Sequence, residues 1–156
     1  MSTSRSRSLR LVASLLALLS GTAFAAAGPT VIELNQVPCQ FLESEGGIDR
    51  GYQSRKADDC VAINDRTADD RLAEAEPMVL APGEYIFRVS NRNVPYVLGF
   101  WLRGDGLLAR ATLPSVSGGG LATGKTQDYR ITLEPGEYVY SCPLNPTPDY
   151  PLVVRE

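Results

Sequence analysis

From residue 78 onward, apolar and polar residues alternate in short runs that are separated by glycine, proline and other turn residues. Alternation with a period of two is typical of half-buried β-strands. A β-branched run at 30–34 has the same character near the N-terminus. The pattern predicts further strands at 85–90, 96–103, 107–112, 127–133, 138–142 and 152–154. Many short strands with regular turns indicate an all-β sandwich or barrel.

Two segments in this part of the chain repeat each other. Residues 80–87 (LAPGEYIF) and 133–140 (LEPGEYVY) share the sequence Pro-Gly-Glu-Tyr. Proline fixes φ at the first central position of a turn, and glycine accepts a positive φ at the second. The repeat therefore predicts that a tight turn opens a strand at both places.

The segment between the first strand and residue 78 has a different composition. Residues 43–57 are polar and contain three glycines, which predicts a loop. The short apolar run 61–63 predicts a brief strand. The acidic stretch 64–76 predicts one or two helical turns, because it begins with an asparagine suited to an N-cap and stops at Pro77. We expect 43–77 to be an irregular insertion with a short helix in one domain, residues 26–156.

The first 25 residues have the features of a secretory signal peptide. Three arginines precede an apolar run at 11–19, and an Ala-Phe-Ala cleavage motif ends at Ala25. A transmembrane helix needs about 20 apolar residues, and this run is about half as long. The sequence therefore predicts a periplasmic or secreted protein with no transmembrane segment after removal of the signal.

Composition and charge narrow the range of partners. The chain has 156 residues, of which 44% are hydrophobic and 21% charged, as in an ordinary globular protein. Loss of residues 1–25 removes three arginines and no acid, which changes the formal net charge from −3 to −6. An acidic chain whose only lysines after residue 25 are Lys56 and Lys125 is a poor partner for nucleic acids or anionic membranes. We expect no nucleic-acid partner.

One nucleotide-binding pattern is present but lacks its context. Residues 119–126 (GGLATGKT) fit the phosphate-loop pattern, which functions only between a strand and the N-terminus of a helix. The residues that follow, 128–133, alternate like a strand. We therefore interpret 119–126 as a glycine-rich surface loop and expect no nucleotide binding.

The chain contains three cysteines, so in an oxidising compartment one thiol is left over. We favour a disulfide between Cys39 and Cys60, because both lie in the N-terminal irregular region. The sequence also permits Cys142 to pair with either of them. If Cys142 is free, its usual role is that of a small buried hydrophobic residue.

The segment 135–145 (PGEYVYSCPLN), followed by a proline-rich loop and a valine-rich strand, resembles the closing strand–loop–strand of cupredoxins such as plastocyanin and azurin. The resemblance implies a cupredoxin-like Greek-key β-sandwich. It places Cys142 at the family's thiolate copper ligand and Asn145 at the loop histidine. It also places Tyr150 at the methionine and Tyr96 at the first histidine. The chain resembles a divergent member of this superfamily.

The ligand chemistry departs from that family. A type 1 copper site needs two imidazoles and one thiolate with a weak axial ligand, and this chain contains no histidine. Asparagine offers a weak carbonyl oxygen, and tyrosine is protonated at neutral pH. We expect no cofactor. We also expect no enzymatic activity, because general acid–base or nucleophilic catalysis usually needs histidine or an activated cysteine beside a base.

The sequence thus favours an exported, non-catalytic binding or interaction module for an unknown protein or small ligand. Its working end would comprise the loops 91–96 and 142–150. One alternative is periplasmic handling of Cu(I) through Cys142 with help from a second sulfur, and another is a divergent cupredoxin electron carrier. The candidate residues are Tyr96, Cys142, Asn145 and Tyr150 at the working end and Met78 as the second sulfur ligand.

Overall fold

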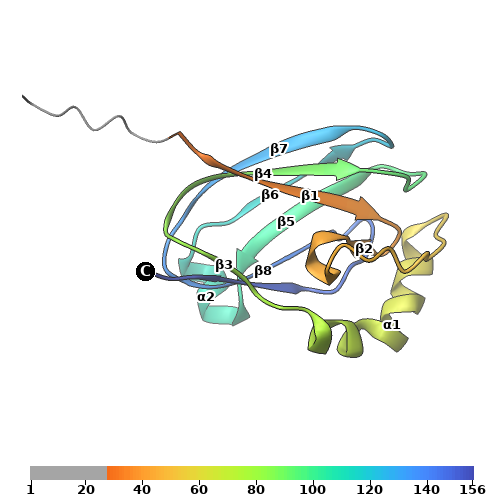
Figure 1. The fold of residues 1–156 in the computed structure, drawn as a ribbon, viewed down its shortest axis with the longest axis horizontal. Helices are drawn as coiled ribbons and strands as arrows, with labels where there is room; N and C mark the ends of the chain where they lie inside the picture. Colours follow the sequence, from red (N-terminus) through yellow and green to blue (C-terminus); the bar gives the residue numbers. More distant parts are fainter. Residues whose placement is uncertain (1–27) are drawn as a thin grey trace, which may run out of the picture.

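The computed structural model describes residues 28–156 as two β-sheets that face each other, with helices along one side (Figure 1). The signal-peptide prediction falls on residues 1–25 and lies outside the described residues. Between residues 28 and 156, no helix combines the length and apolar character that crossing a membrane requires.

The first sheet has the strand order β2-β1-β4-β7. β1 and β4 run parallel, whereas β1–β2 and β4–β7 are antiparallel. The N-terminal strand therefore lies inside this sheet and fixes the start of the domain against β4. The strands are β1 (Thr30–Val37), β2 (Gln40–Phe41), β4 (Gly83–Asn91) and β7 (Thr126–Leu133).

The second sheet has the strand order β3-β9-β8-β5-β6. β9 pairs parallel with β3 and antiparallel with β8, and β5 is antiparallel to both of its neighbours. The short strand β6 forms one edge of this sheet. The strands are β3 (Met78–Leu80), β5 (Leu98–Gly104), β6 (Val116–Leu121), β8 (Gly136–Ser141) and β9 (Tyr150–Val154).

The core is an aromatic cluster between the two sheets. Its centre is Phe100, whose ring centroid lies 5.5 Å from that of Phe87 and 5.1 Å from that of Tyr129. The period-two pattern brings these residues together, because alternate side chains of a strand point to the same face. The all-β sandwich predicted from the sequence is confirmed.

Most of the strand predictions agree with the structure. β4 begins at Gly83 and β8 begins at Gly136, which are the glycines of the repeated Pro-Gly-Glu-Tyr sequence. The predicted surface loop over 119–126 is correct only for 122–125, because 119–121 end β6 and Thr126 begins β7. A strand therefore follows where a phosphate loop would require a helix. The prediction of a strand over 107–112 is wrong.

That segment forms the helix α2 (Gly106–Thr112). Leu107 and Leu108 are 89% and 78% exposed, so the apolar pair that suggested a strand is not buried. Gly106 takes φ +74°, which turns the chain out of β5 and over the sheet. The close approach of α2 to β5 also requires a glycine at 104, since a Cβ there would lie 2.3 Å from the carbonyl oxygen of Ala109.

The insertion 43–77 is more regular than the sequence predicts. A short 3₁₀ helix, η1 (Glu43–Glu45), is followed by the 18-residue helix α1 (Ala57–Glu74). The predicted strand at 61–63 is wrong, because these residues lie in α1, and the helix exceeds the expected one or two turns. Only Cys60 and Arg71 of α1 are buried, so its sequence lacks the 3.6-residue apolar period that identifies most helices.

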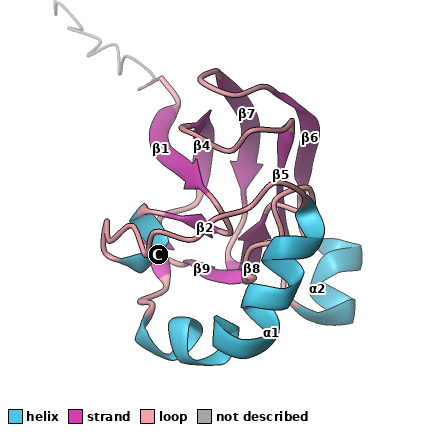
Figure 2. Cartoon of the chain, turned by 90° about the vertical axis from the view of Figure 1, so that its right-hand side faces the viewer, coloured by secondary structure: helices cyan, strands magenta, loops and turns pink. Residues whose placement is uncertain are grey.

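α1 lies across one end of the sandwich, in front of the strands in Figure 2. It contacts the β1–β2 turn through the Cys39–Cys60 disulfide. It contacts the loop between β8 and β9 through Asn64, whose side-chain nitrogen donates to the carbonyl of Pro146 at 2.6 Å. This end of the domain holds most of the candidate residues.

Candidate functional site

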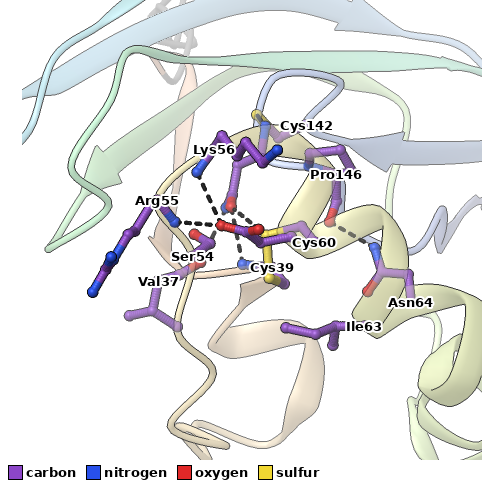
Figure 3. The surroundings of a disulfide bond; sticks show 12 residues. Val37, Cys39, Ser54, Arg55, Lys56, Cys60, Ile63, Asn64, Cys142 and Pro146 are labelled. Carbon is purple, nitrogen blue, oxygen red and sulfur yellow. Dashed lines mark hydrogen bonds between the residues drawn. A yellow bond between two sulfur atoms is a disulfide. The ribbon is translucent and has the colours of Figure 1, made fainter.

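A disulfide between Cys39 and Cys60 joins the β1–β2 turn to the first turn of α1 (Figure 3). The predicted pairing is confirmed, and Cys142 is a free, buried thiol. Cys39 has φ +65°, a backbone conformation that residues other than glycine rarely adopt. The disulfide and two hydrogen bonds to its backbone hold Cys39 in this conformation.

Asn145 is completely buried at the centre of this end of the sandwich. Its side-chain oxygen accepts the backbone N–H of Cys39 at 2.9 Å and lies 3.3 Å from the sulfur of Cys60. Its side-chain nitrogen donates to the carbonyl of Val37 at 3.0 Å and to the side-chain oxygen of Gln36 at 3.3 Å. Both ends of the amide are therefore occupied by partners within the chain.

Cys142 lies next to this amide. Its sulfur accepts the backbone N–H groups of Gly99 and Asn145, at 3.4 and 3.2 Å. Burial raises the pKa of the Cys142 thiol, although these N–H groups act in the opposite direction. Cys142 is therefore a neutral thiol near pH 7, and a neutral thiol is a weak nucleophile and a weak metal ligand.

Tyr96 completes the cluster. Its hydroxyl donates to the side-chain oxygen of Asn145 at 3.4 Å and lies 2.9 Å from the hydroxyl of Ser54. Burial raises the pKa of Tyr96, so the phenol stays protonated at neutral pH. The structure therefore brings together three of the four residues that the cupredoxin resemblance selects, namely Tyr96, Cys142 and Asn145.

Tyr150 belongs to a different network, built around a buried ion pair. Its hydroxyl donates to a carboxylate oxygen of Glu45 at 2.5 Å. The guanidinium of Arg71 donates to the same carboxylate at 2.6 Å and to the carbonyl of Cys39 at 2.8 Å. This network therefore also holds Cys39, through its carbonyl, whereas Asn145 holds it through its N–H.

The sequence gives little sign of this ion pair. Arg71 lies in an acidic stretch of the kind usually exposed to solvent, and charged residues are seldom fully buried. Burial raises the pKa of Glu45, but hydrogen bonds from Arg71, Tyr150 and Arg50 outweigh it, so the pKa lies below its usual value. The carboxylate is charged at neutral pH and fastens α1 to η1.

Met78 does not lie beside Cys142. It pairs with Leu152 of β9, which in turn pairs with Tyr138 of β8. Cys142 is four residues beyond Tyr138, which corresponds to roughly 13 Å along an extended chain. The two sulfur atoms do not form one site in this conformation.

These residues do not fit a type 1 copper centre. The resemblance offers one thiol, one amide and two phenols, and no imidazole exists in the chain. The amide oxygen of Asn145 and both tyrosine hydroxyls already have partners. Over residues 28–156, no three His, Cys, Asp or Glu side chains are grouped so that they could hold a metal ion.

Comparison with known proteins agrees with the sandwich topology. No protein-family model and no curated protein sequence matches the chain. Among solved structures, auracyanin B is similar with a TM-score of 0.50 and 13% sequence identity, over 85% of this chain and 94% of that chain. The fold is cupredoxin-like. At this level of identity the similarity concerns the fold alone, because function depends on individual sites.

Within this cupredoxin-like fold, the end that the resemblance compares with the copper site is an internal hydrogen-bond network covered by α1. The disulfide at its centre is compatible with an exported protein, since disulfides persist in oxidising compartments.

Proposed function

We propose that this protein is an exported, copper-free and non-catalytic binding module with a cupredoxin-like fold. The observation that supports this most strongly is the state of Asn145. Its amide occupies the position that the resemblance assigns to a copper-binding histidine, and it is fully used in hydrogen bonds to β1 and to the β1–β2 turn. A residue in this role stabilises the fold and leaves the surface to carry the function.

The loops 91–96 and 142–150 are the proposed working end. Their buried members anchor them to neighbouring segments, because Asn91 donates to the carbonyl of Leu121, Cys142 accepts the N–H of Gly99 and Asn145 accepts the N–H of Cys39. Pro95 and Leu144 are exposed and lie in loops with little conformational freedom. A preorganised loop loses little entropy when it binds, which favours its use in recognition.

A photo-crosslinking residue placed at Pro95 or Leu144 tests this proposal in cells that export the protein. We expect discrete adducts from both positions. The matched control is the same residue at Glu134, which is exposed in the β7–β8 turn at the other end of the sandwich. Absence of adducts at Pro95 and Leu144, or equal adducts at Glu134, would contradict a working end at these loops.

Handling of Cu(I) by Cys142 is a second candidate, because Cys142 is free and accepts two backbone N–H bonds that would also stabilise a thiolate. It requires one copper per chain after anaerobic loading with Cu(I), and loss of that copper in Cys142→Ser. Met78→Leu should leave the copper in place, since Met78 lies elsewhere. A protein that retains no copper rules out this candidate.

A further inference from the structure

A groove with a volume of about 410 Å³ runs over the outer face of the second sheet. Its lining includes the side chains of Trp101, Pro143 and Leu144. Gly99 and Gly119 also line it and contribute backbone without a side chain. Leu144 is 46% exposed, which leaves an aliphatic side chain on the rim. The groove thus combines apolar side chains with exposed glycine backbone.

Two arginines lie against the indole of Trp101. The guanidinium of Arg103 is 4.0 Å from the ring centroid and that of Arg110, on α2, is 5.7 Å away. Both distances are within the range of cation–π contacts. Trp101 therefore separates an apolar groove from a pair of cations.

The hydrogen-bonding capacity of these arginines is only partly used. Arg103 is 5% exposed and bonds through its terminal nitrogens to Ser141 and Asp149, while its Nε atom is buried without a partner in the described part of the chain. Arg110 is exposed and forms no ion pair within residues 28–156.

The charge of this surface differs from that of the whole protein. The chain without residues 1–25 has a formal charge of −6, yet the cations beside Trp101 have a single acidic partner, Asp149. Leu107 and Leu108 extend the exposed apolar surface along α2. Apolar groups next to the unpaired guanidinium of Arg110 indicate a partner that brings both apolar and anionic groups.

We propose that the groove beside Trp101 docks an extended segment of a partner protein that carries an aromatic or large aliphatic side chain flanked by carboxylates. The apolar side chain lies over the glycines of the groove, against Trp101 and Leu144. A flanking carboxylate pairs with Arg110, because guanidinium groups bind carboxylates with two parallel hydrogen bonds. The inference rests on the proposed binding function and names the partner's chemistry.

Fluorescent octapeptides provide the probe. The test peptide has one central phenylalanine flanked by glutamates, and two matched peptides replace the glutamates by glutamines or the phenylalanine by serine. We expect the test peptide to bind at least about tenfold more tightly than either matched peptide, and to weaken as salt is added. Equal binding of the three peptides, or no binding of any, overturns the inference.

Two substitutions test whether the peptide binds in the groove beside Trp101. Arg110→Glu reverses the exposed charge, and Gly119→Leu fills the groove, because a Cβ at Gly119 meets Leu144 at an ordinary 3.7 Å and causes no clash. Each should weaken binding of the test peptide by about tenfold. Arg130→Glu is the control, since Arg130 is an exposed arginine of β7 in the other sheet.

Unchanged binding in both groove variants overturns the inference, provided that their unfolding midpoints match that of the parent protein. The result of the peptide test can be distinguished from the result of the crosslinking test of the proposed function. If crosslinks form at Pro95 and Leu144 but no octapeptide binds, the protein is a binding module for a partner of different chemistry.

Discussion

The side-chain oxygen of Asn145 accepts the backbone N–H of Cys39 at 2.9 Å, although the two residues are 106 positions apart. This bond joins the loop before the last strand to the turn after the first. The disulfide of Cys39 then continues the connection into α1. Asn145 and Cys39 thus connect the N-terminal and C-terminal segments of the domain at the position where the cupredoxin resemblance places a metal ligand.

Replacement of Asn145 by alanine should destabilise the protein by about 3 kcal/mol, because the buried Cys39 N–H and Val37 carbonyl lose their partner. Urea unfolding followed by tyrosine and tryptophan fluorescence measures this loss. Asn93→Ala is the control, since Asn93 is exposed in the neighbouring loop and should change stability by no more than about 0.5 kcal/mol. A similar small change in both variants would contradict the role of Asn145.

The buried ion pair between Arg71 and Glu45 should show strong coupling. Arg71→Met leaves the carboxylate of Glu45 buried without its main partner and should cost about 3–5 kcal/mol. In the double variant with Glu45→Gln, the loss should be smaller than the sum of the two single losses by at least about 1 kcal/mol. Additive losses in the double-mutant cycle would show that the pair is energetically independent.

The pH dependence of stability should follow Glu45. Its pKa is lower in the folded protein than in the unfolded chain, so its stabilising contribution is complete above the unfolded value of 4.5. The contribution is lost as the pH falls through the lower, folded pKa. Unfolding free energies measured from neutral pH down to about pH 3 should therefore fall more steeply for the parent protein than for Glu45→Gln. Parallel curves for the two proteins would contradict this assignment.

The disulfide should hold α1 in place. Cys39 and Cys60 are 21 residues apart, and removal of such a link by the double substitution to serine should cost about 3 kcal/mol. Trypsin should then cleave at Arg66, in α1, much faster than in the parent protein. Cleavage at Arg130, in β7, serves as the internal reference in the same digest. Equal acceleration at both sites would indicate global unfolding and not release of the helix.

The sequence predicts the sandwich well because strand formation depends on a local pattern. Residues 127–133 alternate between the core and the solvent, and the structure places Tyr129, Ile131 and Leu133 in the core as the alternation requires. The two Pro-Gly turns are equally local. The Cys39–Cys60 pairing was predicted because both cysteines lie in the N-terminal irregular region, and it is confirmed.

The helices could not be predicted in the same way. The main buried attachments of α1 are one disulfide and one arginine, so its sequence carries no clear helical period of apolar residues. The leucines of α2 are exposed, so their apolar character misleads a strand prediction. Two partners of Asn145, Gln36 and Cys39, are over 100 residues away along the chain, and only the folded structure brings them together.

The most direct test of the central claim is native mass spectrometry of the purified, disulfide-bonded protein after equilibration with Cu(II) and, under anaerobic conditions, with Cu(I). We expect the mass of the metal-free chain with one disulfide and one free thiol, and no intense visible charge-transfer band with Cu(II). One retained copper per chain that disappears in Cys142→Ser would contradict the claim, because Cys142 would then act as a metal ligand.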